Sequence, residues 1–597
     1  MLYTSPYPQV ELPERSVWEH VWQNPTKRDD GHPAVIDGPT GRIMSRGELR
    51  TLARQVANGY RTVADLSPGD VVCIFSPNSF YYYGLVLATQ CAGLVFSGAN
   101  AAYTPNELSH QLEDSGAKLL LVHPSLLDVA LSATSSLGWS SQQQKQRIVY
   151  AVRQDEAESA KADFRCLDSL ISTELFTPHA VEEPRTTIAF LGYSSGTSGK
   201  AKGVQTSHYN MTSVLSILGA LETGPNDVQL AVLPLNHESS RSSFSIPRLS
   251  LSSGPLWHQV LTAGSPMSTH IYALTKILLL SVLRAIPVII LPKFTLPALC
   301  SLIERYRITI CMLVPPIALQ LVKTDEADQY DLSSLRLIIS GAAPLGPELE
   351  ERLAVKFPKC EVVQAYGLTE TSPTTHIAIK PKRGSIGPLL PVLKARIIDP
   401  ESGKDVKRGE QGEMWLSGPT IMLGYHRRPE ATAETLVSHP SDPGIVWLRT
   451  GDIAYVDEEG YFFIADRLKE LIKVKGFQVP PAELEATVLE NPSVLDCAVI
   501  GVYKEDEATE YPRAYVVLTE EGKKQADPVT AIHSWTKEKV AHYKQLKGGI
   551  KVVDAIPKSP SGKILRRVLR DQAKQETEQE AKAKKARKDG AAQQAKL

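Results

Sequence analysis

The sequence between residues 193 and 204 reads Tyr193-Ser194-Ser195-Gly196-Thr197-Ser198-Gly199-Lys200-Ala201-Lys202-Gly203-Val204. It follows a short apolar run, residues 187–191, which predicts a buried strand. Its glycines let the backbone approach an oxyanion closely, its hydroxyl and amide groups donate hydrogen bonds, and its lysines supply counter-charge. The spacing is not that of a Walker A loop, because no glycine lies five residues before Gly199 and Lys200. The stretch predicts a polyphosphate cradle at the end of a strand; the alternative is an exposed flexible linker.

These twelve residues resemble the phosphate-binding signature of the adenylate-forming superfamily, which contains acyl- and aryl-CoA synthetases, insect luciferases and peptide-synthetase adenylation domains. The commonest form reads YSSGTTGxPKGV, so Ser198 and Ala201 are departures, of which serine keeps the hydroxyl. The resemblance extends from about Val35 to Arg567. It implies an α/β fold with a large multi-sheet N-terminal domain that includes a β-rich subdomain, followed by a small mobile α+β C-terminal domain. The implied phosphate-binding residues are Ser194, Ser195, Gly196, Thr197, Ser198, Gly199, Lys200 and Lys202.

Length and composition indicate a globular protein of more than one domain. A chain of 597 residues exceeds a single core, and its formal net charge of -1 gives no field that attracts nucleic acid. The seven cysteines have no metal-ligand spacing, which predicts free thiols and a reducing compartment. The first residues lack the apolar segment of a secretory signal. The most apolar window, residues 277–291, is too short to span a bilayer and predicts a helix followed by a buried strand.

The pattern along the chain predicts three regions. Short apolar runs alternate with helical patterns over the first 350 residues, which predicts a largely parallel sheet covered on both faces. From about Lys394 shorter strands with hairpin turns predict the β-rich subdomain. We expect an N-terminal ATP- and acyl-binding domain over residues 1–466, a C-terminal cap domain over residues 467–570, and a charged tail over residues 571–597.

A second motif, residues 364–371, follows a short strand and reads QAYGLTET. Tyr366 offers an aromatic face for adenine, Thr369 a hydroxyl for phosphate, and Glu370 a hard oxygen ligand for Mg²⁺. The alternative is an ordinary strand-to-helix connection in which Thr369 caps the helix. The resemblance favours the nucleotide site, and it adds Gln364, Gly367 and Ala343 to the residues around ATP.

The resemblance assigns further roles towards the C-terminal end. Asp452 is expected to accept hydrogen bonds from the ribose hydroxyls and Arg467 to contact ribose or phosphate, although single charges more often form surface ion pairs. The stretch LKELIKVKGFQ implies Lys469 as the hinge, with Lys473 and Gln478 positioning the acyl-adenylate. The implied coenzyme A residues are Lys475, Gly476 and Phe477. Lys563, in the motif PKSPSGKILRR, is implied to be the adenylation lysine, which neutralises charge developing on the carboxylate and the α-phosphate.

The sequence gives less information about the acyl site than about the nucleotide site. Gly341, Ala342 and Gly367 are small and leave room for a ring or a short-to-medium chain, or they simply pack tightly. The family's LPxFHIYAL segment is split here, with residues 233–237 matching its front and residues 270–274 its back. We predict an insertion over residues 237–269, loop-like in composition and either functional or a gene-model artefact. His270 is then the guarding histidine, and Tyr272 lies beside the acyl site.

The predicted function is an ATP- and Mg²⁺-dependent acyl- or aryl-CoA synthetase of the 4-coumarate-CoA ligase type, with a small carboxylic acid and coenzyme A as substrates. The alternatives are a luciferase-like oxygenase and a non-catalytic adenylate-binding protein inactivated by the insertion. A peptide-synthetase module is disfavoured, because no carrier domain follows Arg567. The ending Ala595-Lys596-Leu597 resembles the peroxisomal Ser-Lys-Leu address, which predicts binding to the peroxisomal import receptor. The cytoplasm is the other expected location.

Overall fold

The structure of the chain is a computed structural model. It describes residues 1–157, 163–194, 201–221, 230–232, 260–263, 271–292, 294–313, 315–341, 345–378, 381–467, 470–474, 477–504, 509–540, 542–558 and 564–576. Contacts divide the chain into two compact units. The first comprises Met1–Arg396, Trp415–Thr450 and Val456–Phe463, and the second comprises Ile397–Met414, Gly451–Tyr455 and Ile464–Leu597.

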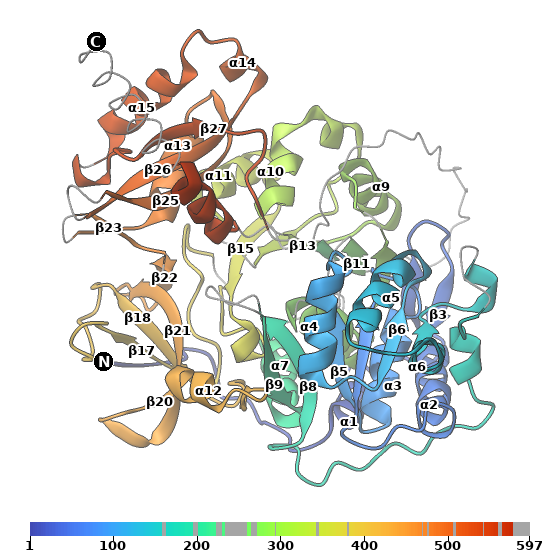
Figure 1. Cartoon of the computed structure of the whole chain (residues 1–597). Helices are drawn as coiled ribbons and strands as arrows, with labels where there is room; N and C mark the ends of the chain where they lie inside the picture. The colour runs from blue at the N-terminus through green and yellow to red at the C-terminus, as the bar shows by residue number, and fades with distance from the viewer. Residues whose placement is uncertain are drawn as a thin grey trace, which may run out of the picture. The chain divides into compact units, whose positions relative to one another are not determined.

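The first unit contains a seven-stranded sheet with the order β19-β9-β8-β5-β4-β6-β7 (Figure 1). Its strands are β4 (Val71–Phe75), β5 (Val95–Ala99), β6 (Leu119–Val122), β7 (Ile148–Tyr150), β8 (Ile188–Ser194), β9 (Lys202–Ser207) and β19 (Gly424–Tyr425). The five strands from β7 to β8 are parallel neighbours, and β9 and β19 extend the sheet by antiparallel pairs. The helices of this region are α2 (Arg46–Thr62), α3 (Tyr82–Cys91), α4 (Pro105–Ser115), η1 (Pro124–Leu126), α5 (Leu127–Ser136), α6 (Ser141–Arg147), η2 (Gln154–Glu156) and η3 (Leu167–Leu170). The predicted parallel sheet is confirmed here.

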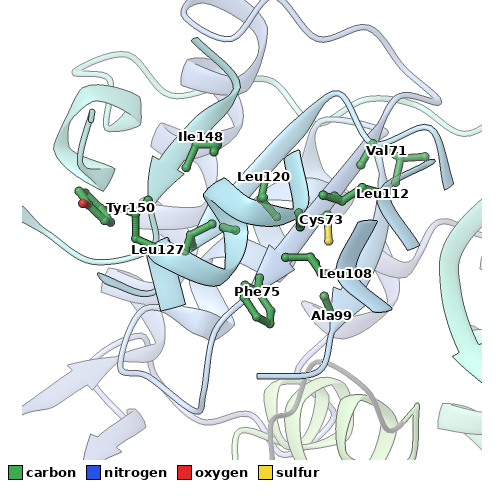
Figure 2. Close-up of a cluster of buried hydrophobic side chains, with 14 of the residues drawn as sticks. Val71, Cys73, Phe75, Ala99, Leu108, Leu112, Leu120, Leu127, Ile148 and Tyr150 are labelled. Atoms are coloured by element: carbon green, nitrogen blue, oxygen red, sulfur yellow. The ribbon is translucent and has the colours of Figure 1, made fainter. Parts of the chain in front are cut away.

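Strand β4 shows why these apolar runs become central strands. All five of its residues are buried, because helices cover both faces of the sheet. Its residues Val71, Cys73 and Phe75 belong to one core cluster with Leu108 of α4 and Leu127 of α5 (Figure 2). Complete burial of a side chain such as Phe75 contributes about 1.5–3 kcal/mol to stability. This core holds the carboxyl end of β8, where the polyphosphate cradle is predicted.

The second sheet of this unit has nine strands in the order β16-β15-β14-β13-β10-β11-β12-β2-β3. The strands are β2 (Pro33–Asp37), β3 (Ile43–Ser45), β10 (Leu230–Val232), β11 (Val260–Ala263), β12 (Val288–Leu291), β13 (Ile310–Leu313), β14 (Leu337–Ser340), β15 (Glu361–Tyr366) and β16 (His376–Ile377). Only the two outer pairs, β15–β16 and β2–β3, are antiparallel among the pairs described. Its helices are α1 (Val17–Val21), α7 (His208–Leu221), η4 (Ala273–Leu279), α8 (Leu280–Arg284), α9 (Leu296–Tyr306), α10 (Pro315–Lys323), η5 (Asp325–Gln329) and α11 (Pro347–Lys356).

Strand β11 corrects the interpretation of residues 237–269 as loop-like throughout. Val260–Ala263 pair in parallel with β12 on one side and with β10 on the other, so they are a central strand. The sequence signal was too weak because a run of four residues shows no measurable periodicity among the surrounding serines. The other residues of this segment lie outside the described part of the chain.

The apolar window at residues 277–291 folds as predicted. The π-helix η4 continues into α8, which ends at Arg284, and β12 begins four residues later. Ala285 adopts a left-handed conformation with φ 50° and ends the helix. Among the residues that the structure describes, no helix is both long enough and apolar enough to cross a membrane.

The β-rich region begins at Lys394, as the change of sequence pattern predicts. Its elements are β1 (Leu2–Thr4), β17 (Lys394–Ile398), β18 (Gly412–Ser417), α12 (Pro429–Thr435), β20 (Leu436–His439), β21 (Asp442–Val456) and β22 (Phe462–Arg467). Within the first unit, β1 pairs with the first residues of β17, and β20 forms an antiparallel hairpin with β21. The turn at Asp399 is closed by hydrogen bonds that Gly403 N donates to Asp399 O and Asp399 N to Lys404 O.

The second unit carries the α+β domain. Its elements are β23 (Ile472–Val474), β24 (Phe477–Val479), α13 (Pro481–Leu489), β25 (Val494–Lys504), β26 (Thr509–Leu518), α14 (Glu520–Lys523), α15 (Pro528–Lys539), η8 (His542–Lys544) and β27 (Gly549–Val552). Strand β26 pairs with β25 in antiparallel and with β27 in parallel orientation. Alternate residues of β25 enter two cores, Val499 on one face and Ile500 on the other.

A last helical segment, residues 566–576, packs on the Ile500 face through Leu569 and Ala573. Glu576 at its end forms an ion pair with Arg513 at 3.2 Å. The segment therefore includes residues 571–576, which the sequence assigns to the charged tail. The rest of the tail, with Ala595-Lys596-Leu597, lies outside the described residues.

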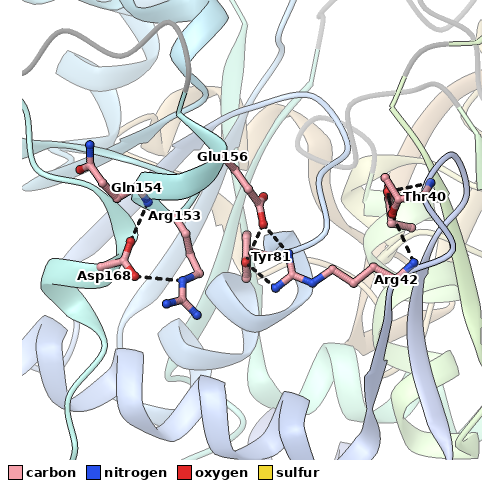
Figure 3. Close-up of polar contacts among 8 residues, drawn as sticks. Thr40, Arg42, Tyr81, Arg153, Gln154, Glu156 and Asp168 are labelled. Atoms are coloured by element: carbon pink, nitrogen blue, oxygen red, sulfur yellow. Dashed lines mark hydrogen bonds and ion pairs between the residues drawn. The ribbon is translucent and has the colours of Figure 1, made fainter.

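A polar cluster joins elements of the two large sheets in the first unit (Figure 3). Arg42, between β2 and β3, forms an ion pair with Glu156 of η2 and donates to the Tyr81 hydroxyl at 2.9 Å. Tyr81 in turn donates to Glu156 at 2.8 Å. Next to Glu156, Arg153 pairs with Asp168 at 2.9 Å. Exposed ion pairs contribute about 0–1 kcal/mol each, so these contacts fix the geometry of the surface more than they stabilise the fold.

All seven cysteines are free and buried. Burial raises the pKa of each thiol, to about 12 for Cys73, Cys91, Cys300 and Cys360. The pKa values of Cys166, Cys311 and Cys497 are raised by the same cause. A thiol that is buried and protonated is a poor nucleophile. These cysteines are therefore packing residues.

Candidate functional site

The predicted polyphosphate cradle lies between two paired strands. β8 and β9 are antiparallel, and their pairing runs from Ile188↔Ser207 to Ser194↔Lys202. The first and the last of the predicted phosphate-binding residues, Ser194 and Lys202, are therefore opposite one another. Residues Ser195, Gly196, Thr197, Ser198, Gly199 and Lys200 lie outside the described part of the chain.

Lys202 contacts the second motif through Tyr425. The Lys202 Nζ lies 4.8 Å from the centre of the Tyr425 ring, and the Tyr425 hydroxyl donates to Glu370 Oε1 at 2.9 Å. Strand β19 places Tyr425 here by pairing with β9, where Tyr425 is opposite Val204. Burial and the Glu370 carboxylate raise the pKa of Tyr425, so the hydroxyl remains a hydrogen-bond donor. The structure thus brings together two residues, Lys202 and Glu370, that the sequence predicts separately.

Thr369 also lies beside the strand that carries the cradle. A Cβ added to Gly192 of β8 would lie 3.1 Å from the Thr369 methyl group, so the Thr369 side chain packs closely against the β8 backbone. Thr369 begins η6 (Thr369–Thr371), whose N-cap is Leu368. The alternative in which Thr369 caps a following helix is therefore wrong. The hydroxyl and the carboxylate of this motif sit next to the end of β8.

Gln364 binds protein groups on both sides of its amide. Its Oε1 accepts a hydrogen bond from Leu345 N at 2.9 Å, and its Nε2 donates to Glu350 Oε1 at 2.8 Å. Gln364 is paired in register with Ser340, so it stands at the carboxyl ends of β14 and β15. The side chain therefore links Leu345 to Glu350 of α11. Glu350 is a residue that the sequence did not indicate, because its partner is contributed by another element.

Gly367 is required by packing. A Cβ at this position would lie 1.5 Å from the carbonyl oxygen of Pro373 and 3.0 Å from the Thr374 Cα. Of the two interpretations of this glycine, room for a substrate or tight packing, the structure shows tight packing. The turn after Tyr366 closes on backbone atoms and leaves no space for a side chain.

Tyr366 packs edge-on against His376, with ring centres 5.6 Å apart. His376 is fully buried and also contacts Phe462 at 4.5 Å, and its Nδ1 lies 2.9 Å from the Thr375 hydroxyl. Burial lowers the pKa of His376 from its ordinary 6.5 to about 3. A neutral imidazole therefore supports the tyrosine that is predicted to face adenine.

This histidine predicts an acid-sensitive fold. Between pH 6.5 and 3 the unfolded chain binds a proton at His376 that the folded chain does not, so stability falls as the pH falls. At pH 5 the loss relative to pH 7.5 is about 2 kcal/mol from this group. We expect H376Q to lose about 2 kcal/mol less than the wild type over this pH interval in urea unfolding. The control is H533Q, at a half-buried position of α15, and an unchanged pH dependence in H376Q would contradict the expectation.

Two of the predicted acyl-site residues are adjacent. A Cβ on Gly341 would lie 3.6 Å from the Tyr272 Cζ, an ordinary contact distance. Gly341 N donates to Leu313 O, which fixes the start of this segment on β13. Lys276, fully buried on η4, lies with its Nζ 5.7 Å from the centre of the Tyr272 ring. His270, Ala342 and Ala343 lie outside the described residues.

In the second unit, Asp452 lies in β21 and is 3% exposed. The neighbouring Gly451, in the same strand, donates its backbone N–H to Glu413 Oε1 at 3.2 Å. A carboxylate at such a position can accept hydrogen bonds from a ribose diol. Arg467 ends β22, and its side chain lies outside the described part of the structure.

Lys473 and Gln478 are directly opposite in the β23–β24 hairpin. The sequence assigns both to the acyl-adenylate. Phe477 is opposite Val474, so it follows the turn of the hairpin. The remaining predicted residues of this unit, Lys469, Lys475, Gly476 and Lys563, lie outside the described residues.

Sequence reasoning missed Tyr425, Glu350 and His376. Tyr425 is 55 positions from Glu370 in the sequence, and only the pairing of β19 with β9 brings it to the site. The local signal available was the Gly424-Tyr425 pair between two structured segments, which does not by itself indicate a contact.

Comparison with known proteins agrees with this geometry. The family described as AMP-binding enzyme matches residues 21–252 and 248–426, and the family described as AMP-binding enzyme C-terminal domain matches residues 483–563. The two matches of the first family meet inside residues 237–269. The chain belongs to the AMP-binding enzyme family.

Two relatives are plant enzymes. 4-coumarate–CoA ligase 1 of Arabidopsis thaliana is 33% identical over 588 residues, which cover 96% of this chain and 95% of that protein. 4-coumarate-CoA ligase 1 of Narcissus pseudonarcissus is 33% identical over 583 residues, covering 95% and 96%. A solved structure, ATP-bound MatB from Rhodopseudomonas palustris, is similar with a TM-score of 0.75 and 26% identity, covering 93% of this chain and 98% of that one. The predicted adenylate-forming fold is confirmed by these matches.

Proposed function

We propose that the chain is an ATP-dependent acid–thiol ligase that joins a carboxylic acid to coenzyme A and releases AMP and pyrophosphate. The observation that carries the proposal is the contact of Lys202 with Tyr425 and of Tyr425 with Glu370. Through Tyr425 it connects Lys202, the last of the predicted phosphate-binding residues, with the carboxylate of the second motif. The plant relatives, named as CoA ligases, support the same reaction.

The reaction has two steps. A carboxylate oxygen of the acid bonds to the α-phosphorus of ATP, and the bond from that phosphorus to the bridging oxygen breaks, so pyrophosphate leaves. The coenzyme A sulfur then bonds to the acyl carbon, its proton is lost, and AMP leaves with the carbon–oxygen bonding pair. Both steps depend on holding the reacting groups in line and on stabilising negative charge. Lys202 would stabilise the negative charge, because it is one of the residues that are predicted to bind phosphate.

Glu370 fits a magnesium ion bound mainly through phosphate. Within the described residues, no group of three or more His, Cys, Asp or Glu side chains is arranged to hold a metal. Mg²⁺ commonly takes one or two carboxylates, substrate phosphates and waters, so a single carboxylate is sufficient. The Tyr425 hydroxyl donates to Glu370 Oε1, so this carboxylate is held in place by a neighbouring strand. When bound, the ion would neutralise phosphate charge as pyrophosphate departs.

The hydroxyl of Tyr425 is expected to raise the affinity of this site for Mg²⁺. In Y425F the ring still faces Lys202, but Glu370 loses its hydrogen-bond donor. Losing such a supporting contact typically lowers metal affinity by about 10- to 100-fold. We expect the Mg²⁺ concentration for half-maximal pyrophosphate release to rise about tenfold. The control is Y503F, at an exposed position of β25, and equal Mg²⁺ dependence in Y425F and wild type would contradict the role.

For the thioester step we propose that the β23–β24 hairpin carries the residues involved. Lys473 and Gln478, opposite in register, would hold the acyl-adenylate, and the Lys475-Gly476-Phe477 turn would lie beside coenzyme A. The hinge is proposed at Lys469, next to the start of the second unit's long terminal segment at Ile464. These roles rest on the family signature and on the register of the hairpin.

The testing experiment measures acid-dependent pyrophosphate release with ATP, Mg²⁺ and coenzyme A. The acid panel contains cinnamates, benzoates, phenylacetate and medium- to long-chain fatty acids. Pyrophosphate release together with consumption of the thiol, for one class of acid, establishes the ligase. Release accompanied by oxygen uptake or light would indicate an oxygenase. Bound ATP without release from any acid would indicate a non-catalytic nucleotide-binding protein.

We also propose a peroxisomal location. The ending Ala595-Lys596-Leu597 supports it, because it differs from the Ser-Lys-Leu address by one small residue. A fluorescent fusion that keeps this ending exposed should enter peroxisomes. The same fusion without Leu597 should remain in the cytoplasm, and identical distributions would refute the proposal.

A further inference from the structure

A buried ionic cluster in the second unit is centred on Arg566. Its guanidinium donates from one terminal nitrogen to Glu470 Oε2 and from the other to both oxygens of Glu485, at 2.9 and 2.7 Å. Its Nε donates to Val499 O at 3.3 Å, and Glu485 also accepts from Val499 N at 2.7 Å. All three charged residues are 7–9% exposed. Each of the three guanidinium nitrogens therefore donates at least one hydrogen bond.

The cluster joins parts of the chain that are far apart in sequence. Glu470 is 96 residues from Arg566 and directly follows Lys469, the proposed hinge. Glu485 lies on α13 and Val499 on β25, which form the core of the domain. Arg566 itself begins the last helical segment, three residues after Lys563.

The residues on both sides of positions 559–563 are also fixed. The backbones of Lys558 and Ile564 form an antiparallel bridge, and Leu565 N donates to Pro557 O at 2.8 Å. Lys558 Nζ forms an ion pair with Asp496 Oδ2 at 2.6 Å, next to β25's buried Cys497. The described residue before this stretch, Lys558, is thus attached to Asp496, and Arg566 after it is attached to Glu470 and Glu485.

We propose that Arg566 and Glu470 are positioning residues for Lys563, because they hold residues 564–566, which follow it in the chain, in a fixed relation to the residue after the hinge. This proposal rests on the proposed ligase function, in which Lys563 acts in the adenylation step. A bidentate guanidinium–carboxylate contact in a buried setting is rigid and directional, which a lysine or an apolar pair would not reproduce. A buried ionic cluster adds little net stability, because desolvation offsets the attraction. Its main effect here is to define position.

The consequence concerns motion as well as placement. Because Glu470 immediately follows the proposed hinge, a change of backbone conformation there would be transmitted through Arg566 to the start of the last helical segment, three residues after Lys563. A displacement of about 1 Å at a reacting group can cost on the order of 10²-fold in rate. Loosening the cluster should therefore affect the adenylation step most.

The experiment compares E470Q and R566K with wild type, K563A and the control K551Q. Lys551 is a half-buried residue of the same unit, with an ion pair to Glu576 at 3.8 Å. For each protein we would measure kcat and the KM for ATP in pyrophosphate release, the rate of coenzyme A reaction with supplied acyl-adenylate, and Tm. E470Q keeps the size of the side chain, so it also tests the proposal if R566K does not fold.

We expect E470Q and R566K to lower the adenylation kcat by about 10²-fold, with the KM for ATP and the reaction of supplied acyl-adenylate changed less than fivefold. The double variant E470Q/R566K should be no slower than the slower of the two single variants, because both substitutions disrupt the same contact between Arg566 and Glu470. Unchanged adenylation in a folded E470Q, or equal loss in both half-reactions with a lowered Tm, would overturn the proposal. A wild type without pyrophosphate release from any acid would instead refute the ligase function.

Discussion

Replacing Lys563 by alanine is expected to slow acyl-adenylate formation by about 10³-fold while leaving the reaction of supplied acyl-adenylate with coenzyme A near the wild-type rate. A preorganised positive charge stabilises the negative charge that develops between the carboxylate and the α-phosphate. When the thiol attacks the acyl carbon, negative charge develops instead on the acyl oxygen and on the departing AMP, a step in which the motif implies no role for Lys563. The two half-reactions should therefore separate.

The measurement is isotope exchange between ATP and pyrophosphate for the first step and thioester formation from synthetic acyl-adenylate for the second. K551Q provides the matched control for loss of a lysine charge in the same unit. Loss of both half-reactions in K563A, at unchanged Tm, would show that Lys563 does not have the role that the motif implies.

The G367A variant should lose about 4 kcal/mol of folding free energy or fail to fold. The added Cβ would lie 1.5 Å from Pro373 O and 2.6 Å from Pro373 C, and neither backbone atom can move aside by rotation of a side chain. The turn from β15 to Glu370 would have to open. Any folded fraction should therefore also release pyrophosphate more slowly.

The matched control for stability is G341A. Its Cβ would meet Tyr272 at 3.6 Å, an ordinary van der Waals contact, so we expect a change below about 1 kcal/mol. Urea unfolding and the soluble yield of both variants measure the difference. A G367A protein as stable as the wild type would mean that the turn is open in solution.

The parallel sheets were predictable because their strands are continuous apolar runs. β4 and β12 are buried on both faces, so their sequences carry a strong signal without any knowledge of neighbours. β11 was not predictable, because its four residues form a strand only between β10 and β12. Pairing, rather than local sequence, determines such a strand.

The candidate site divides in the same way. Lys202 and Glu370 were predicted because each lies in a motif whose residue types suit phosphate or a hard cation. Tyr425, which connects them, has no such local pattern. Gln364 was assigned to the nucleotide, but its amide binds Leu345 and Glu350, since composition alone cannot distinguish a ligand contact from a contact between elements.

The seven buried cysteines have a practical and a chemical consequence for a protein proposed to use a free thiol as substrate. Because all seven thiols of this chain are buried, none is available for thiol–disulfide exchange with coenzyme A disulfide. A colorimetric thiol reagent added to the native protein should then react with coenzyme A and not with the protein. Disappearance of that colour would follow turnover directly, acid by acid, without a coupled assay.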